Sequence, residues 1–264
     1  MSNQINIIDN DPWQNLRKFT DARIGLGRCG TSLPLNEVLD FKLSHARARD
    51  AVLQPMQTVK IQNELKENDI DSISLSSSVI DRSEFLTRPD KGRQLSYESA
   101  TLLQNHATES DICIVVGDGL SSRAIHENCV PFLTTFHQAI QKSSYKIAPI
   151  CMVENGRVAI ADEIASYFSA KLGIILIGER PGLSSPNSLG IYLTYNPKPG
   201  MTDESRNCIS NIREGGLSIT EGVKKLAYLI EMAFYQKESG VYLKDKMSSD
   251  YLPFSDRINQ ASLN

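Results

Sequence analysis

The sequence predicts an α/β protein in which helices flank a mostly parallel β-sheet, and two observations support this fold class. Short β-branched apolar runs at residues 112–116 and 172–177 each end in a glycine-containing turn, as buried parallel strands do. Segments of about ten or more residues with helical spacing separate such runs, which is the pattern of βαβ units. We therefore expect an N-terminal arm over residues 1–20, a largely helical region over 21–95 and a Rossmann-like domain over 96–264.

The helical region begins with a long predicted helix between Pro34 and Pro55. Its apolar residues recur every three or four positions and would share one face, namely Leu35, Val38, Leu39, Leu43, Ala46 and Leu53. Pro34 suits the first turn of a helix, and Pro55 would end it because proline lacks the amide hydrogen that a helical turn needs. Residues 56–94 alternate short helical and polar pieces, and a further helix is expected over 95–106.

Five strands are expected in the Rossmann-like domain, at residues 111–116, 145–153, 172–177, 191–195 and, as a short one, 208–212. A helix follows the first of them, and Pro131 is expected to open a second helical piece. The helix before the third strand is expected to stop at Gly173, in the position just past the end of a helix. A capping box at Ser218-Ile219-Thr220-Glu221 predicts the start of the last long helix, which Gly240 would end.

Composition excludes several classes of function. The 264-residue chain has a net charge of −3, which argues against bulk electrostatic binding to nucleic acid or to anionic membranes. No apolar run reaches the roughly 20 residues of a membrane span, and the N-terminal residues do not resemble a secretory signal. The five cysteines are scattered without zinc-ligand spacing, so we expect no metal site and reduced thiols in a cytosolic protein. The four histidines lack a neighbouring Ser/Asp constellation, which argues against a hydrolase triad.

Three motifs have both a functional and a structural interpretation. Gly25-Leu26-Gly27-Arg28-Cys29-Gly30 matches G-x-G-x-x-G, but no strand pattern precedes it, so a glycine-rich connector is favoured over a dinucleotide cradle. Gly117-Asp118-Gly119 lies between a strand and a helix, where it could receive a phosphate or simply form a tight turn, and both interpretations stay open. Lys42, His45 and Arg49 form a basic stripe on the first long helix, which is either a solvated face or a docking stripe for an acidic partner.

The loop Gly178-Glu179-Arg180-Pro181-Gly182 is the best-placed candidate for a ligand loop. It directly follows the third predicted strand, and ligands of open α/β sheets bind at the carboxyl ends of the strands. Glu179 could contact a ligand or pair with Arg180, although an exposed pair of neighbours contributes only about 0–1 kcal/mol. Val158 opens the helix that leads into this strand, and it could equally be a core residue.

Several long strings of this sequence resemble the small (light) subunit family of ethanolamine ammonia-lyase. They are residues 22–28 (ARIGLGR), 40–52 (DFKLSHARARDAV), 117–121 (GDGLS), 176–183 (LIGERPGL) and 206–213 (RNCISNIR). The resemblance runs from about residue 13 to residue 245, with the motifs in the order of the family.

The resemblance implies an adenosylcobalamin-dependent lyase that converts ethanolamine into acetaldehyde and ammonia by a radical rearrangement. In this family the large subunit, a TIM barrel, holds the substrate and the adenosyl group. The small subunit closes over the other side of the corrin ring and its nucleotide tail. The chain would therefore bind cobalamin, carry no catalytic residue and be inactive alone. Members of the family keep the cofactor's own dimethylbenzimidazole on cobalt, so no protein residue is needed as a metal ligand.

Cofactor contacts of the family carry over to three residues, which would make residues 96–264 the cobalamin-binding domain. Val158, in the string Gly-Arg-Val-Ala, would make a main-chain or apolar contact. Glu179, in Gly-Glu-Arg-Pro-Gly, would accept hydrogen bonds from cobalamin side-chain amides or a ribose hydroxyl. Cys208, in Asn-Cys-Ile-Ser-Asn-Ile, would contribute van der Waals contact or a weak hydrogen bond, and not a bond to cobalt.

The resemblance also implies a cytoplasmic enzyme. Relatives often carry a longer leader that helps packaging into a bacterial microcompartment, and the short arm here leaves packaging open. Two other hypotheses also remain open at this point. One is a nucleotide- or dinucleotide-binding Rossmann protein that acts alone, and the other is a purely structural subunit whose sheet has lost its ligand.

Overall fold

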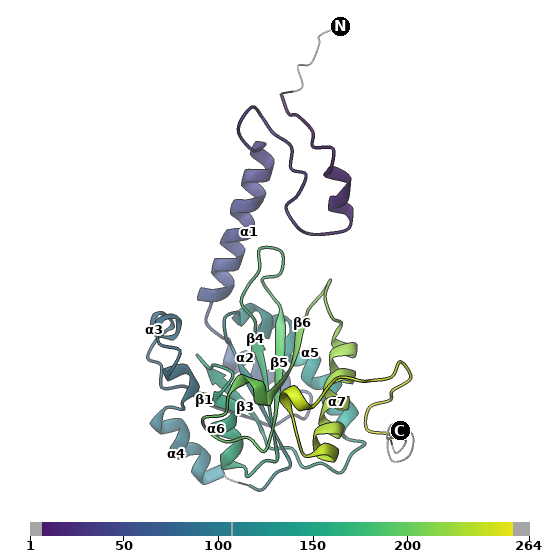
Figure 1. Cartoon of the computed structure of the whole chain (residues 1–264). Coiled ribbons are helices and arrows are strands. Elements are labelled where there is room, and N and C mark those ends of the chain that lie inside the picture. The colour runs from purple at the N-terminus through teal and green to yellow at the C-terminus, as the bar shows by residue number, and fades with distance from the viewer. Residues whose placement is uncertain (1–6, 107, 256–264) are drawn as a thin grey trace.

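The computed structural model describes residues 7–106 and 108–255 and shows an α/β fold with one six-stranded sheet and helices on both of its faces (Figure 1). The strands are β1 (Ser72–Ser76), β2 (Ile112–Gly117), β3 (Ile150–Glu154), β4 (Leu172–Gly178), β5 (Leu189–Tyr195) and β6 (Arg206–Ile212). The helices are α1 (Leu35–Leu53), α2 (Thr58–Lys66), α3 (Arg82–Thr87), α4 (Tyr97–His106), α5 (Ser122–Ile140), α6 (Ile160–Tyr167) and α7 (Ile219–Gln236). Short 3₁₀ turns lie at Gln14–Lys18, Lys91–Arg93, Asp203–Ser205 and Gly240–Tyr242.

The sheet is mixed. Its strands lie in the order β1-β3-β2-β4-β5-β6, of which the first four are parallel, whereas β5 runs antiparallel to β4 and β6 antiparallel to β5. The α/β class is confirmed, but the expectation of a mostly parallel sheet fails at this end. Residues 179–188 join β4 to β5 without a helix, and a parallel return needs a crossover of about a dozen residues or more.

The first strand of the sheet comes from the segment that the sequence shows only as short polar pieces. β1 is an edge strand that pairs with β3, and Leu75 is its one buried apolar residue. Serines alternate with apolar residues along it, so it lacks the continuous apolar run that marks a strand buried on both faces. The sheet therefore begins before residue 95, and the expected domain division at that residue stays a prediction.

Two hydrophobic clusters fill the space between the sheet and its helices. Along β2, side chains alternate between them: Ile112, Ile114 and Val116 join one cluster, and Cys113 and Val115 join the other. Residues of α2, α5 and α7 contribute to the first cluster, and residues of α4 and α6 to the second. The central strands are thus covered on both faces, which explains their uninterrupted apolar runs.

Proline positions account for two differences from the expected elements. Pro131 does not open a new helix but lies inside α5, where it removes one backbone hydrogen bond. The buried rings of Phe132 and Phe136 hold the helix against the core in the turns that follow the proline. The strand expected over 145–153 is limited to β3, because Pro149 directly before it has no amide hydrogen for the ladder.

Two helices end earlier than expected, and at residues other than glycine. α6 ends at Tyr167, after which Ser169 adopts a positive φ of 49°, while Gly173 lies inside β4. α7 begins as expected, with the Ser218 hydroxyl accepting a hydrogen bond from the Glu221 amide. It ends at Gln236, followed by Lys237 with φ 58°, and not at Gly240. Both ends use the left-handed conformation that glycine usually supplies.

The apolar face of α1 is exposed. The helix follows the expected bounds but stands away from the sheet together with the N-terminal segment (Figure 1). Leu35, Leu39 and Leu43 are 72%, 54% and 50% exposed. Arg17 forms an ion pair of 2.7 Å with Glu37, which ties the N-terminal segment to α1. The first six residues of the expected arm 1–20 lie outside the described residues.

A buried ion pair joins the edge strand β6 to α6. The Arg206 guanidinium binds both carboxylate oxygens of Asp162, at 2.8 and 2.6 Å, and their side chains are 2% and 1% exposed. Arg206 also donates to the Thr194 hydroxyl at 3.0 Å and to the Met201 carbonyl at 2.9 Å. This side chain therefore fixes the β5–β6 loop against α6.

Replacing Arg206 with methionine is expected to lower the free energy of unfolding by about 3–5 kcal/mol, because it leaves the Asp162 carboxylate buried without its partner. Urea unfolding of the full chain measures the loss. Arg213→Met is the matched control, since Arg213 is only partly buried just beyond β6 and bonds to neighbouring residues. A loss below about 1 kcal/mol for Arg206→Met would contradict the role given to the pair.

Candidate functional site

Glu179 lies at the carboxyl end of β4, where the sequence places the candidate ligand loop. Its amide donates to the Ser188 carbonyl at 2.9 Å. Its Oε2 accepts the Ser188 hydroxyl at 2.5 Å and the Asn211 amide at 3.2 Å, so it links the β4–β5 loop to the end of β6. Its Oε1 accepts no hydrogen bond within the described part of the chain. A Cβ at Gly190 would lie 2.9 Å from Oε1, so glycine there leaves room for the carboxylate.

The surface next to Glu179 is a part of the sheet that no described helix covers. Tyr192 of β5 and Cys208 of β6 are register partners, and Tyr192 packs at the edge of the cluster that α4 and α6 share. α6 reaches over β2 and β4 on this face, whereas α5 and α7 contact β5 on the opposite face. Cys208 is exposed and Tyr192 is partly exposed. Tyr192, Cys208 and the Glu179 carboxylate thus form one open surface.

The tyrosine and the cysteine on this surface are held in their neutral forms. Burial raises the pKa of Tyr192 to about 12, with the neighbouring Cys208 and Glu179 adding to the shift. Burial also raises the pKa of the Cys208 thiol, against a hydrogen bond from Tyr192 that lowers it. Near pH 7 the surface therefore presents a phenol and a thiol. A thiol is a poor nucleophile and a poor metal ligand, since both roles need the thiolate.

Val158 lies on the same side of the sheet but at a different strand end. It sits in the turn between β3 and α6, is half-buried and packs against the α4/α6 cluster. No hydrogen bond among the described residues joins it to Glu179 or Cys208. It borders a cavity of about 790 Å³ that is also lined by Arg93, Arg157 and Met201. The structure thus brings Glu179 and Cys208 together with Tyr192, which the sequence interpretation missed, and places Val158 beside a separate hollow.

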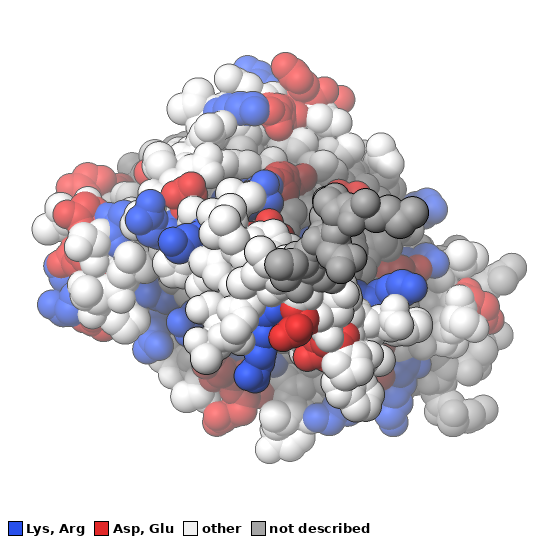
Figure 2. Space-filling view, turned by 90° about the horizontal axis from the view of Figure 1, so that it is seen from above, with Lys and Arg blue, Asp and Glu red and all other residues white. Residues whose placement is uncertain are grey.

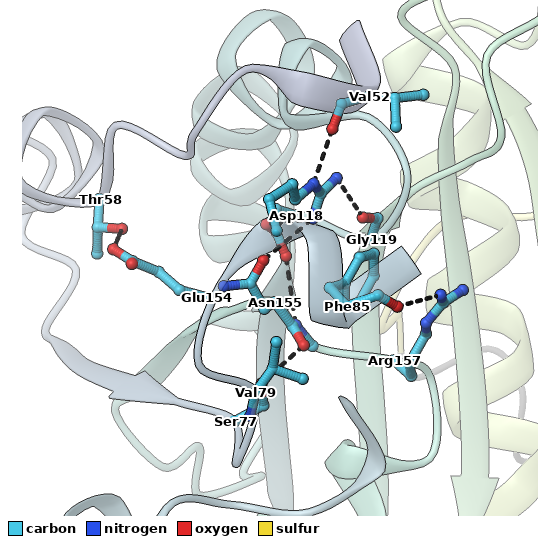
Figure 3. A network of polar contacts seen from close by, with 12 residues as sticks. Val52, Thr58, Ser77, Val79, Phe85, Asp118, Gly119, Glu154, Asn155 and Arg157 are labelled. Carbon is cyan, nitrogen blue, oxygen red and sulfur yellow. Dashed lines mark hydrogen bonds and ion pairs between the residues drawn. The ribbon is translucent and has the colours of Figure 1, made fainter. Parts of the chain in front are cut away.

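A buried network organises the turns at this edge of the sheet (Figure 3). Arg82 donates to Asp118 Oδ2 at 2.9 Å, to the Val52 carbonyl at 2.7 Å and to the Gly119 carbonyl at 2.8 Å. Asp118 Oδ1 accepts the Gly156 amide at 3.3 Å, and its side chain is 4% exposed. The network joins the end of α1, the turn after β2 and the turn after β3.

The same contacts favour the structural interpretation of Gly117-Asp118-Gly119. Gly119 has a φ of 53°, and a Cβ there would lie 2.5 Å from the Gly178 carbonyl oxygen. The Leu120 amide donates to that carbonyl at 3.0 Å, and Asp118 faces Arg82. The turn is therefore packed against β4 and does not present its amides as a phosphate cradle.

The described residues contain no cluster of three or more His, Cys, Asp or Glu side chains that could hold a metal ion. Within the same residues, no helix is long and apolar enough to cross a membrane. On the face seen in Figure 2, basic and acidic side chains are interspersed and do not gather into one basic patch. No described strand precedes the Gly25–Gly30 motif, in line with a glycine-rich connector. The candidate site thus combines the carboxylate, phenol and thiol of the Glu179 surface with a separate cavity at Val158. Both basic and acidic residues line that cavity, namely Arg93, Arg157, Asp90, Glu163 and Asp203.

Comparisons with known proteins agree on one family. The family model for the ethanolamine ammonia-lyase light chain (EutC) matches residues 10–244. The "Ethanolamine ammonia-lyase small subunit" of Pseudomonas fluorescens SBW25 is 48% identical over 257 residues, which is 96% of this chain and 92% of the relative. The proteins of the same name from Pseudomonas putida W619 and Ralstonia nicotianae are 45% and 46% identical, covering 98% and 90% of this chain and 97% and 90% of the relatives.

Asp118 is expected to make stability fall as the pH rises from about 4 to 6. Burial raises its pKa from 3.8 to about 6, against the opposing effect of Arg82. Because the folded state then binds the proton more tightly than the unfolded state, the contribution is fully present below about pH 4 and is lost above about pH 6. The difference in unfolding free energy between wild type and Asp118→Asn should change by about 3 kcal/mol over this range.

Urea unfolding at a series of pH values measures how this difference in unfolding free energy changes with pH. The loss of the Arg82 partner in Asp118→Asn adds a constant to the difference and does not alter its pH dependence. Asp111→Asn is the matched control, because the Lys146 amide lowers the pKa of Asp111 and its effect falls below about pH 4. Parallel pH profiles for wild type and Asp118→Asn would show that Asp118 does not titrate in this window.

Proposed function

The chain belongs to the ethanolamine ammonia-lyase light-chain family, and we propose that it is the cobalamin-binding small subunit of an enzyme that converts ethanolamine into acetaldehyde and ammonia. The observation that supports a binding role most directly is the open surface of Glu179, Tyr192 and Cys208. It offers a fixed acceptor and neutral polar groups without an acid–base pair. We propose that the substrate site lies on the large subunit and that this chain is inactive alone.

The residues present fit adenosylcobalamin. The rim of a corrin carries carboxamide side chains, which donate and accept hydrogen bonds. Glu179 Oε1 is an acceptor without a partner among the described residues, and the Tyr192 hydroxyl can both donate and accept. Cys208 beside them supplies a neutral contact, and Val158 an apolar or main-chain contact at the cavity. When bound, the cofactor supplies the radical chemistry.

This chain's own residues would hold and orient the cofactor. Two structural donors fix Oε2 of Glu179, so the carboxylate is held in place before any ligand arrives. A pre-positioned acceptor avoids part of the entropy cost of binding. The Cys208 thiol would not ligate cobalt, because its pKa is raised by burial.

We propose that the exposed apolar face of α1 docks on the large subunit. The name "small subunit" that the relatives carry implies a larger partner. Leu35, Leu39 and Leu43 are at least half exposed on a helix that stands away from the sheet. A contiguous apolar helix face of this kind usually marks an interaction surface. The basic stripe of Lys42, His45 and Arg49 on the same helix would add charge contacts at its rim.

The finer expectations about organisation and location stay proposals. We propose a cobalamin-binding domain over residues 96–264, preceded by an arm over 1–20 and a helical region over 21–95. We also propose a cytoplasmic enzyme, with packaging into a bacterial microcompartment left for direct test. Fractionation of cells that produce the protein would decide that last point.

Purifying the chain with its large partner and titrating adenosylcobalamin tests the function. Cobalamin binding, with ethanolamine lysis only when both subunits are present, is the expected result. If the isolated chain bound NAD and did not respond to cobalamin, a nucleotide-binding protein acting alone would replace the proposal. A complex that bound neither compound would leave a purely structural subunit.

Glu179→Gln is expected to weaken cobalamin binding by the complex about tenfold or more, because it removes the negative charge from the free acceptor. Glutamine keeps the size of the side chain, so the β4–β5 loop should stay in place. Equilibrium dialysis gives the dissociation constant. Glu98→Gln on α4 removes the same charge from an exposed helix position and should leave the constant unchanged. An unchanged constant for Glu179→Gln would count against direct contact.

Leu39→Glu is expected to abolish co-purification with the large subunit while leaving the unfolding free energy of this chain nearly unchanged, since Leu39 is 54% exposed. Affinity purification of a tagged large subunit and urea unfolding provide the two readouts. Val59→Glu on α2 is the matched control, because Val59 is 72% exposed outside the proposed docking face. Retention of the Leu39→Glu variant on the large subunit would place the interface elsewhere.

A further inference from the structure

A cavity of about 200 Å³ lies at the amino edge of the sheet, where β1 and β3 begin. Residues that precede these two strands and residues from the second half of α5 enclose it. Glu179 and Val158, in contrast, follow the carboxyl ends of β4 and β3. The cavity is therefore at the opposite edge of the sheet from the candidate functional site and has no part in it.

The inner wall of this cavity is apolar. The buried residues that line it come from β2, β3 and α5 and are at most 5% exposed, namely Ile114, Ile150, Leu133 and Phe136. Ala148, just before β3, also lines the cavity and contributes only a methyl group. An apolar cavity of about 150 Å³ takes up a benzene molecule. This cavity therefore has room for one compact ring or branched alkyl group.

The turn after α2 places two acidic residues at the rim of the cavity. Asp69 has a φ of 57°, and the Ile70 amide donates to the Leu65 carbonyl at 3.0 Å, which closes the end of the helix. This turn buries Ile70, which is 6% exposed, between the exposed residues Asp69 and Asp71. All three of these residues line the cavity. The acidic residues therefore lie on its solvent side.

The two carboxylates at the rim lack partners among the described residues. Asp69 and Asp71 form no ion pair and no side-chain hydrogen bond within residues 7–106 and 108–255. His137 of α5, which is partly exposed, is the other polar residue among the described residues that line the cavity, and none of those is a lysine or an arginine. The rim therefore favours a cationic group over an anionic one.

We propose that this cavity binds a small primary amine with a compact apolar body, held as its ammonium ion. The apolar body fills the space between α5 and the sheet, and the ammonium group lies at the carboxylates of Asp69 and Asp71. Such a ligand gains from both parts of the cavity, because its body leaves water and its charge meets carboxylate acceptors. The site does not depend on the proposed function, since it shares no residue with the candidate functional site.

Comparing phenethylamine with phenethyl alcohol, which has the same ring and chain without the charge, tests the site. Ligand-observed NMR titrations of the full chain at about pH 8, where histidine is in general neutral, give both dissociation constants. The amine should bind about 2- to 30-fold more tightly than the alcohol, the effect of two exposed ion pairs. Combining Asp69→Asn with Asp71→Asn should abolish this difference and leave the constant of the alcohol unchanged. Glu67→Gln is the matched control, because it removes an exposed carboxylate of the same turn that does not line the cavity.

Two variants that fill the cavity test the apolar part of the site. Ala148→Leu should remove binding of both compounds, and His137→Trp, at the partly exposed rim, keeps the test valid if Ala148→Leu fails to fold. Ethanolamine, which has no apolar body, should bind about tenfold or more weakly than phenethylamine. No saturable binding of phenethylamine, equal binding of amine and alcohol, or binding that survives a folded filling variant would overturn the site. The double aspartate variant should leave cobalamin binding by the complex with the large subunit unchanged, so that failure of this site and failure of the proposed function are distinguishable.

Discussion

The buried ion pair between Arg82 and Asp118 is the interaction on which the carboxyl edge of the sheet depends. One guanidinium holds the end of α1 through Val52, the turn after β2 through Gly119 and the Asp118 carboxylate. Asp118 in turn holds the Gly156 amide in the turn that leads to Val158. A buried charge that loses its partner is strongly destabilising, so loss of one of these contacts weakens the others. The base of the projecting helix and the turns beside the candidate site therefore form one rigid unit.

The antiparallel end of the sheet explains why one face of β5 and β6 stays uncovered among the described residues. Each parallel strand needs a crossover, and the helices of those crossovers cover both faces of β2 and β4. β5 and β6 return through loops, so no crossover helix lies over Tyr192 and Cys208. In place of a crossover helix, the ion pair between Arg206 and Asp162 holds β6 to α6. The result is a strand pair that is held in place while one of its faces stays open.

Local patterns in the sequence predict those structural features that depend on residues close together in the chain. The strands at 112–117 and 172–178 were predictable because burial on both faces demands uninterrupted apolar residues, and the Ser218 cap because its bond is local. The direction of β5 depends on a loop length and a pairing partner, which no periodicity reveals. Arg82 and Asp118 are 36 residues apart, and the sequence around neither residue indicates that the two form an ion pair. Glu179 could be found from its place after a strand. Tyr192 follows from the period of two only once the uncovered face of β5 is known.

The exposed apolar face of α1 is a second feature that the sequence pattern explains only in part. Periodicity identifies which residues of a helix share an apolar face, but it does not say which protein covers that face. In this chain the described residues leave that face uncovered, so the pattern indicates a contact with another protein.

The titrating groups of the candidate site also indicate a binding role. The phenol of Tyr192 and the thiol of Cys208 are neutral near pH 7. Asp118, whose pKa is raised to about 6, is buried against Arg82 and out of reach of a substrate. General acid–base catalysis needs a group that exchanges protons near the working pH within reach of the substrate. The surface offers fixed acceptors and donors instead, which suits binding, and under the proposed function the proton transfers would come from the large subunit.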